Sequence, residues 1–345
     1  MTNIWAHPLY REDIQAITQC DLPWEKLEGK NVLVTGATGM IGSCLVDVLL
    51  AHGHIGVQAM GRSKQRAKVR FSYCWEHPLF TFIEQDVCEP FHVDAPVDFI
   101  IHAASNTHPK AYATDPIGTI TANVTGMQQL LEAAHRYHTE RVCLLSSVEI
   151  YGENKTGKPF METDMGYIDC NTLRAGYPEG KRVAEALCQA YRSVYGIETV
   201  AMRLCRVYGP TVLSTDSKAL SQFIGNAVRG EDIVLKSEGT QFFSYIYTAD
   251  AVSAILTGLL KGEDGQAYNV ADAQSNITLR DLAAVLAHTA GTQVVFELPD
   301  AVEQAGFSKA TMAILDSAKL KALGWIPMQT IHSGLRRTWR ILSSL

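Results

Sequence analysis

Long apolar runs are missing from this 345-residue chain. No stretch approaches the roughly 20 apolar residues that a helix needs to cross a bilayer. The N-terminus, MTNIWAHPLYREDIQ, also has no apolar core of signal-peptide length. We therefore expect a soluble, cytoplasmic protein with no membrane partner.

Clusters of positive charge are missing as well. Lys and Arg number 30 against 36 Asp and Glu, the formal net charge is −6, and no basic block stands out. Affinity for nucleic-acid backbones comes mainly from clustered Lys and Arg, so a nucleic-acid partner is not expected. The length is ample for one large domain or two modest ones.

The chain has no CxxC pair, although it holds eight cysteines. Without a signal peptide, scattered cysteines are expected to be reduced, buried thiols. Two histidine pairs raise the question of a metal: His52 with His54, and His135 with His138. Neither pair has an obvious carboxylate or thiolate to complete a coordination shell, so we predict no metal site.

Continuous apolar strands alternate with helices from residue 31 onwards. The predicted strands are Asn31–Thr35, Gly56–Met60, Thr81–Glu84, Phe99–Ile101, Arg141–Ser146 and Thr199–Leu204. The predicted helices are Met40–His52, Thr119–His138 and Tyr177–Tyr195. Such alternation indicates an α/β fold, a doubly wound parallel sheet covered by helices on both faces.

The alternation breaks after Gly209-Pro210, where shorter, mixed segments follow together with one more apolar helix, Ala249–Leu260. We therefore divide the chain into three parts. They are an N-terminal extension (1–28), a dinucleotide-binding domain (29–205, completed by about 246–272) and a smaller mixed α/β substrate domain (206–245 and 273–345).

The segment NVLVTGATGMIGSCLVDVLL is the strongest local signal. Gly36, Gly39 and Gly42 stand where a buried strand turns into a helix. Glycines there let backbone approach a pyrophosphate, which then faces the free N–H groups of the helix N-terminus. A purely structural glycine turn is the alternative. We predict a Rossmann-type phosphate site made by Gly36, Thr38, Gly39, Met40, Ile41 and Gly42.

The end of the second strand bears on the choice between NAD and NADP. An acidic residue there would bind a ribose 2′-hydroxyl, but Gly61 takes its place and Arg62 and Ser63 follow. This slightly favours NADP, unless these are merely solvated surface residues. The other residues expected along the dinucleotide are Asp86, Val87, Ala103, Ala104, Ser105 and Asn123.

The segment AGYPEGKRVAEAL places Tyr177 and Lys181 four residues apart, on one face of a helix. A tyrosine with a pKa near 10 is a poor base at neutral pH. A nearby ammonium is expected to lower that pKa, and Lys181 can also bind the cofactor ribose. The hydroxyl of Ser147 would complete a proton relay to a substrate hydroxyl. A chance surface pair is the alternative.

The motifs TGATGMIG, SSVEIYG, YPEGK and LGWIP together resemble an extended short-chain dehydrogenase/reductase. More narrowly, the chain resembles the NAD-dependent epimerase/dehydratase family, which modifies nucleotide sugars. The block RAGYPEGKRVAEALCQAY is especially similar to UDP-glucuronate decarboxylases. The resemblance implies that Ser147, Tyr177 and Lys181 are the family's catalytic trio, and that the chain forms a homodimer through the helices near 119–138 and 177–195.

Glu149 follows Ser147 by two residues, and alternate residues on a strand face the same side. The resemblance implies a catalytic role, because dehydratases and decarboxylases of the family carry a glutamate here and many epimerases lack it. In 4,6-dehydratases this glutamate removes the C5 proton. The alternative is that Glu149 caps a loop or pairs with an arginine such as Arg174.

Three positions depart from the family pattern. Val148 stands where several dehydratases carry an aspartic acid that expels the C6 hydroxyl. Phe243 stands where the family usually has an arginine that binds the substrate diphosphate, and Arg206 replaces the family asparagine before YGP. We expect Phe243 and Arg206 to border the substrate cleft, with Arg206 taking over the anionic group.

The sequence thus predicts an NAD(P)-dependent enzyme acting on a nucleotide sugar by transient oxidation at C4. Decarboxylase, dehydratase and epimerase types remain open. Two alternatives are an NADPH-dependent reductase of a small carbonyl compound, which Phe243 favours and Glu149 disfavours, and a non-catalytic dinucleotide sensor.

Overall fold

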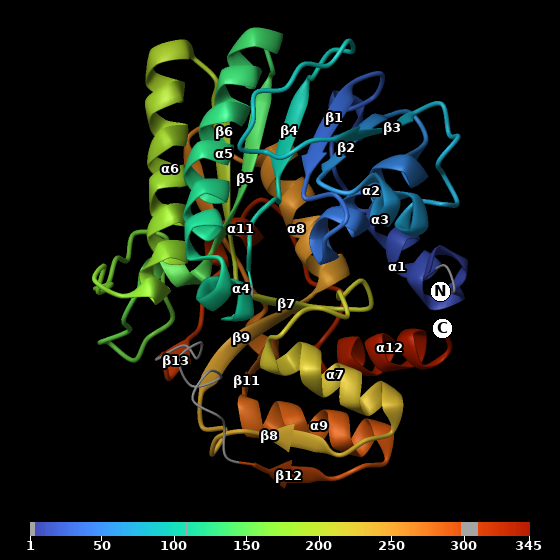
Figure 1. Cartoon of the computed structure of the whole chain (residues 1–345), viewed down its shortest axis with the longest axis vertical. Helices are drawn as coiled ribbons and strands as arrows, with labels where there is room; N and C mark the ends of the chain where they lie inside the picture. The colour runs from blue at the N-terminus through green and yellow to red at the C-terminus, as the bar shows by residue number, and fades with distance from the viewer. Residues whose placement is uncertain (1–3, 108, 298–309) are drawn as a thin grey trace.

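A seven-stranded parallel sheet forms the centre of the computed structural model, which describes residues 4–107, 109–297 and 310–345. Its strand order is β10-β6-β5-β4-β1-β2-β3 (Figure 1). The strands are β1 Asn31–Thr35, β2 Gly56–Gly61, β3 Phe80–Glu84, β4 Phe99–His102, β5 Arg141–Ser147, β6 Glu198–Leu204 and β10 Gln266–Val270. The predicted doubly wound α/β fold is confirmed. Chain order reverses between β1 and β4, and such a switch point opens a crevice at the carboxyl edge of the sheet.

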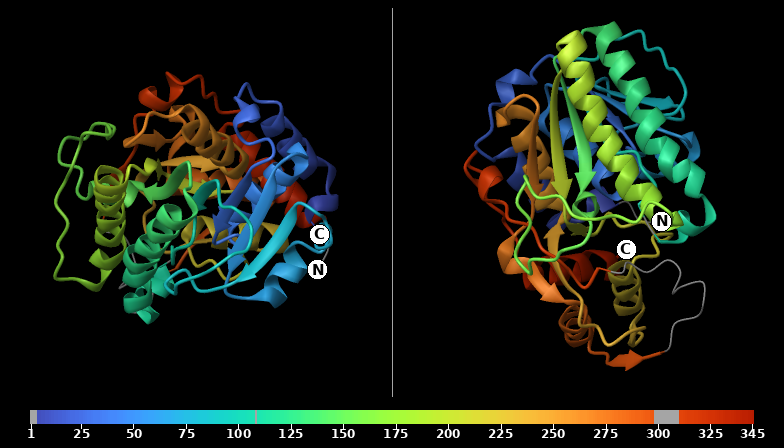
Figure 2. Two further views of the ribbon diagram at one scale, coloured as in Figure 1. Left: turned by 90° about the horizontal axis from the view of Figure 1, so that it is seen from above. Right: turned by 90° about the vertical axis from the view of Figure 1, so that its left-hand side faces the viewer.

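Helices cover both faces of this sheet (Figure 2). One face carries α1 Pro8–Thr18, α2 Met40–His52 and α8 Thr248–Lys261, and the other carries α5 Pro116–Tyr137 and α6 Gly176–Tyr195. Helix α5 begins three residues earlier than predicted. Asp115 explains this start, because its side chain accepts a hydrogen bond from the N–H of Gly118 and Pro116 suits the first helical position.

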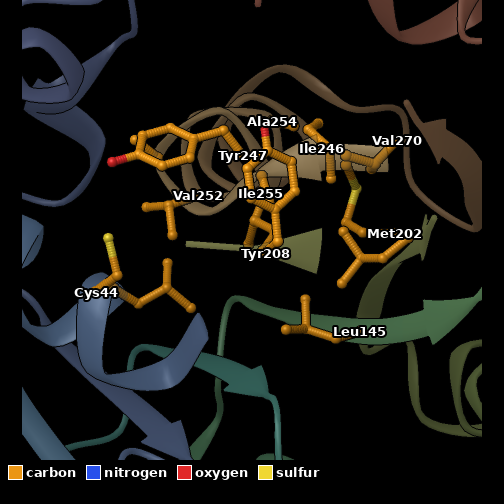
Figure 3. Packing of buried hydrophobic residues seen from close by; sticks show 14 of the residues in the cluster. Cys44, Leu145, Met202, Tyr208, Ile246, Tyr247, Val252, Ala254, Ile255 and Val270 are labelled. Atoms are coloured by element: carbon orange, nitrogen blue, oxygen red, sulfur yellow. The ribbon is translucent and has the colours of Figure 1, made fainter. Parts of the chain in front are cut away.

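The core between the sheet and α8 is almost entirely apolar. Helix α8 is buried from Thr248 to Leu260, and its buried carboxylate, Asp250, accepts hydrogen bonds from the N–H groups of Met328 and Gln329. Figure 3 shows Leu145 and Met202 from the sheet near Val252 and Ile255 of this helix. All eight cysteines are free, as predicted; five are buried and Cys170 is exposed.

A second, smaller lobe lies below the carboxyl edge of the large sheet (Figure 1). Its strands β7 Arg206–Tyr208, β9 Phe242–Tyr247, β11 Asn276–Thr278 and β13 Met312–Ala313 form a mixed sheet. Helices α7 Ala219–Arg229, α9 Leu279–Ala290 and α12 Ile331–Ser343 pack beside it, with a ribbon of β8 Ile233–Leu235 and β12 Val294–Phe296. No helix in the described ranges combines the length and apolarity needed to span a bilayer.

The N-terminal segment is anchored by a buried polar cluster around Asp47 of α2. This carboxylate is fully buried and accepts hydrogen bonds from the hydroxyls of Tyr10 and Tyr73, both at 2.5 Å. It also forms an ion pair with Arg70. Because Tyr10 lies in α1, the cluster ties the N-terminal helix to the large domain.

We predict that Asp47→Asn lowers the free energy of unfolding by about 3 kcal/mol or more, because Arg70 would keep a largely buried charge without its partner. Guanidinium unfolding followed by circular dichroism measures this. Glu231→Gln is the matched control, since it breaks the exposed Arg229–Glu231 pair and should cost less than about 1 kcal/mol. Equal losses in the two variants would contradict the prediction.

Candidate active site

The glycine turn between β1 and α2 is packed too closely for any other residue type. Gly36 has a φ of +63°, and a Cβ atom there would come within 2.8 Å of the Ala103 backbone. A Cβ atom on Gly42 would come within 2.3 Å of the Gly36 carbonyl oxygen. Gly39 caps α2 without a side-chain hydrogen bond, which leaves N–H groups of the first turn available. The turn therefore fits a pyrophosphate at the helix N-terminus.

The end of β2 lies beside this turn. A Cβ atom built on Gly61 would be 3.8 Å from the Thr38 hydroxyl oxygen. The Arg62 side chain is 63% exposed and reaches Asp86 only at 4.0 Å. The Ser63 hydroxyl caps helix α3, Lys64–Arg70, by accepting a hydrogen bond from the N–H of Arg66.

The remaining residues predicted along the dinucleotide fall into two groups. A Cβ atom on Gly36 would come within 2.8 Å of backbone atoms of Ala103 and Ala104, so these residues lie against the glycine turn. Ser105 donates a hydrogen bond to the Asn123 side chain at 3.0 Å. Ala103, Ala104 and Ser105 directly follow β4, and Asn123 lies in α5. By contrast, the Val87 side chain packs in the core. Asp86 accepts a hydrogen bond from the N–H of Cys88, while Met40 and Ile41 form the first turn of α2.

Three of the predicted catalytic residues come together at the carboxyl end of β5. Ser147 is the last residue of the strand, and its hydroxyl lies close enough to the Tyr177 phenol to lower the pKa of that phenol. Lys181 lies one turn further along α6 and donates to the Leu145 carbonyl at 2.7 Å. Strand alternation distinguishes the two serines, because the neighbouring Ser146 instead bonds Glu185 at 2.5 Å.

Burial is the largest cause of the pKa shifts of Tyr177 and Lys181. It raises the pKa of Tyr177 to about 12, with Glu149 adding to the rise, while the hydrogen bond from Ser147 and the charge of Arg174 lower it. Burial also lowers the pKa of Lys181 to about 8, against the charge of Glu185. The prediction that Lys181 lowers the pKa of Tyr177 is therefore wrong for the protein alone, because desolvation of the phenolate outweighs the other effects.

Glu149 lies next to Ser147 in space, but it is not on the strand as predicted. Strand β5 ends at Ser147, and Glu149 belongs to a 3₁₀ turn, Val148–Tyr151. Its backbone N–H donates to the Ser147 hydroxyl oxygen at 3.2 Å, and its carboxylate accepts from Arg174 at 2.8 Å. The predicted alternative of a pair with Arg174 is thus what the structure shows.

Tyr112, in α4 Pro109–Thr114, is a site residue that sequence reasoning missed. Its ring centroid lies 5.2 Å from that of Tyr177 and 4.7 Å from the guanidinium carbon of Arg174. The segment around Tyr112 carries no motif. Only its position after β4, where the chain crosses the carboxyl edge of the sheet, could have drawn attention to it.

Two of the departures from the family pattern touch each other. The guanidinium carbon of Arg206 lies 3.4 Å from the Phe243 ring centroid, since β7 and β9 are neighbouring strands. The Nη1 atom of Arg206 is buried and has no hydrogen-bond partner among the described residues. The third departure, Val148, is buried beside the site and carries no acid.

The histidine pairs have other contacts. His52 stacks on Trp24 with ring centroids 4.6 Å apart, and His135 contacts Tyr195 at 4.4 Å. Within the described ranges, no group of three or more His, Cys, Asp and Glu side chains could hold a metal ion.

Known proteins resemble this chain over most of its length. A UDP-glucuronic acid decarboxylase of Arabidopsis thaliana is 32% identical over 305 residues, covering 88% of this chain and 86% of that protein. One from Danio rerio is 30% identical over 314 residues, covering 91% and 73% respectively.

Solved structures show the same fold. An epimerase of Methanothermobacter thermautotrophicus matches with a TM-score of 0.79 and 21% identity, covering 98% of this chain and 97% of that one. UDP-glucuronic acid 4-epimerase of Bacillus cereus, solved with UDP-glucuronic acid and NAD, matches with a TM-score of 0.76 and 21% identity over 91% and 99%.

A family model also matches most of the chain. The model described as the NAD dependent epimerase/dehydratase family matches residues 32–271. The match spans the large sheet from β1 to β10, apart from Asn31, the first residue of β1. This chain therefore belongs to the NAD dependent epimerase/dehydratase family, whose members are extended short-chain dehydrogenases/reductases.

Proposed function

We propose that the protein decarboxylates a nucleotide-linked uronic acid, such as UDP-glucuronate, through transient oxidation at C4 of the sugar. The observation that carries the proposal is that Ser147, Tyr177 and Lys181 lie together at the carboxyl end of β5, at the edge of the sheet that also holds the glycine turn. The similarity to UDP-glucuronic acid decarboxylases supports the choice of substrate.

In this mechanism Tyr177 takes the proton of the C4 hydroxyl, and Ser147 positions that hydroxyl through its own hydrogen bond. A bound nicotinamide dinucleotide supplies the redox chemistry by accepting the C4 hydride and later returning it. Lys181, already held by the Leu145 carbonyl, is placed to bind the ribose and to add positive charge near the phenolate. Burial keeps water away from this proton transfer.

The ketone formed at C4 activates the neighbouring group. The C6 carboxylate is attached at C5, so it becomes a β-keto acid, and the C5–C6 bond breaks to release carbon dioxide. The bonding electrons form an enolate across C4 and C5, which takes up a proton at C5. Under this proposal the C5 proton comes from water, with Glu149 as the ionisable side chain that would relay it. Tyr177 would return its proton to the C4 oxygen when the hydride returns to C4, so that protons and electrons balance over the cycle.

We predict that Tyr177→Phe lowers kcat by about 10²- to 10⁴-fold, the usual contribution of a positioned acid or base. The assay follows carbon dioxide release from UDP-glucuronate, with NAD or NADP bound and no net change in absorbance of the reduced cofactor. Dinucleotide affinity should be unchanged, which serves as the control for folding.

Four outcomes would contradict this function. Stoichiometric consumption of NADPH with a small carbonyl compound, and none of the closed cycle, would identify a reductase. Tight dinucleotide binding without turnover of any UDP-, dTDP-, GDP- or CDP-sugar would identify a sensor. Proton loss from C5 without carbon dioxide would instead indicate the dehydratase type, and inversion at C4 the epimerase type.

The substrate diphosphate would bind Arg206 under this proposal. The Phe243 ring holds one face of its guanidinium, and the buried Nη1 donors lack a partner in the described residues. A guanidinium whose face contacts an aromatic ring can still donate hydrogen bonds to an anion, because its N–H groups lie in the guanidinium plane. Arg206 would thus replace, from β7, the cation that the family usually places on β9.

We predict that Arg206→Ala weakens binding of UDP by about 10- to 150-fold, the loss of a charge-assisted contact worth about 1.5–3 kcal/mol. Calorimetry with the dinucleotide-loaded protein measures this. Uridine, which lacks phosphate, should bind both proteins alike, and Arg229→Ala is a control at an exposed arginine. Unchanged UDP affinity would show that Arg206 does not bind the diphosphate.

For the cofactor, we propose a preference for NADP over NAD. The residue that ends β2 is Gly61 rather than an acid, and the exposed Arg62 is only loosely engaged with Asp86. Both features suit a 2′-phosphate. The B. cereus structure named above contains NAD. The proposed preference for NADP therefore rests only on the residues of this chain at the end of β2.

We predict that Gly61→Asp reverses the preference, weakening NADPH binding about tenfold or more and strengthening NADH binding, because the carboxylate would repel a 2′-phosphate and accept from a 2′-hydroxyl. Fluorescence titration of the two cofactors measures this. The site tolerates a side chain, since the φ of Gly61 is not positive and a Cβ atom would lie 3.6 Å from Phe82. Gly61→Ala is the control. Tighter NADH binding by the parent protein would refute the preference.

A homodimer is also proposed. Helices α5 and α6 lie side by side on one flank of the molecule (Figure 2), and apolar side chains on them are exposed. These are Ile117, Ile120, Val183, Val194 and Tyr195. Pairing of two such flanks would bury this surface.

A further inference from the structure

The guanidinium of Arg174 is incompletely paired. It carries five N–H donors, one on Nε and two on each terminal nitrogen. Nη2 donates to Glu149 at 2.8 Å, but Nε and Nη1 are buried and have no hydrogen-bond partner within the described ranges. Buried donors of a charged group are rarely left without an acceptor, so these three N–H groups call for a ligand.

The position of Arg174 is as informative as its missing partners. It lies in the 3₁₀ turn Leu173–Ala175, three residues before Tyr177 and directly ahead of α6. Tyr112 contacts both of them, with its ring near the guanidinium on one side and near the Tyr177 ring on the other. A ring face attracts a cation but offers no lone pair to an N–H group that points past it. The unpaired donors therefore sit within the same group of side chains as the phenol.

Sugar geometry indicates which anion would reach these donors. If the C4 hydroxyl lies on Tyr177, the C6 carboxylate is only two bonds away from C4. We propose that Arg174 is a specificity-determining residue that binds the carboxylate of a uronic acid sugar, sharing its guanidinium between that carboxylate and Glu149. The inference rests on the proposed function and adds the residue that distinguishes a uronate from a neutral sugar.

Under this proposal Arg174 affects substrate binding more than the chemical step. Glu149 and a substrate carboxylate are both negative, and the guanidinium between them relieves their repulsion. The new ion pair is lost when the carboxylate leaves as carbon dioxide, so it favours bound substrate over the transition state. Loss of the pair should therefore raise KM for the uronate more than it lowers kcat.

The test compares two ligands in the full chain loaded with dinucleotide, in a Tyr177→Phe background that prevents turnover. The reference protein carries Tyr177→Phe and Glu149→Gln, and the test protein carries Arg174→Gln in addition. Because Glu149 is already neutral in the reference, removing Arg174 does not leave an unpaired carboxylate. Relative to the reference, we expect UDP-glucuronate affinity to fall roughly 10- to 100-fold. The affinity for UDP-glucose, which has no carboxylate, should change less than about threefold.

Two further variants make the comparison sharper. Arg174→Lys keeps the charge but loses the planar fork, so part of the discrimination should survive. Arg192→Gln, near the other end of α6, breaks an ion pair with Asp264 and should alter neither affinity. In turnover with Tyr177 intact, Arg174→Lys should show the larger effect in KM.

The outcomes separate this inference from the proposed function. Equal weakening for both ligands would show a structural role for Arg174 and overturn the inference, while the proposed function would stand. If the protein with Arg174 intact bound neither UDP-glucuronate nor UDP-glucose, the proposed function would fall and the inference with it. Selective loss of the uronate in the glutamine variant, partly rescued by lysine, supports the assignment.

Discussion

The burial of a phenol beside an ammonium is the constraint on which the rest of the site depends. Removing Tyr177 from water raises its pKa to about 12, and the same desolvation lowers the pKa of Lys181 to about 8. Both shifts favour the neutral forms of the two groups. The protein alone therefore favours the protonated phenol, and the Ser147 hydroxyl and, to a smaller extent, the charge of Arg174 oppose that shift.

Two arginines of the candidate site have the same kind of surroundings. Arg174 and Arg206 are each placed against an aromatic ring, Tyr112 and Phe243, and each keeps buried nitrogen donors unpaired among the described residues. A nucleotide-linked uronate carries anionic groups at two places, the diphosphate at C1 and the carboxylate at C6. Two partly satisfied arginines on opposite lobes match that distribution, whereas a neutral, uncharged carbonyl compound would leave both without a partner.

Short-range patterns predicted the frame of this site. The glycine spacing located the phosphate turn, and the four-residue spacing of Tyr177 and Lys181 placed both on the inner face of α6. Contacts between distant segments were not predictable. Arg206 reaches Phe243 because β7 pairs with β9, and Tyr112 reaches Tyr177 because the chain after β4 folds across the end of the sheet. Neither contact leaves a periodic trace in the sequence, and the same holds for the anchoring of α1 through the hydrogen bond between Tyr10 and Asp47.

The pairing of Glu149 bears on which reaction the site is built for. A dehydratase needs a free base to remove the C5 proton and an acid to expel the C6 hydroxyl. Here the carboxylate is already engaged by Arg174, and Val148 offers no acid. Abstracting a proton would require Glu149 to break an ion pair in a largely buried setting, where such a break is costly. Decarboxylation avoids that step, because the electrons at C5 come from the breaking C–C bond and only a proton must be delivered afterwards. The arrangement thus suits loss of carbon dioxide better than loss of water.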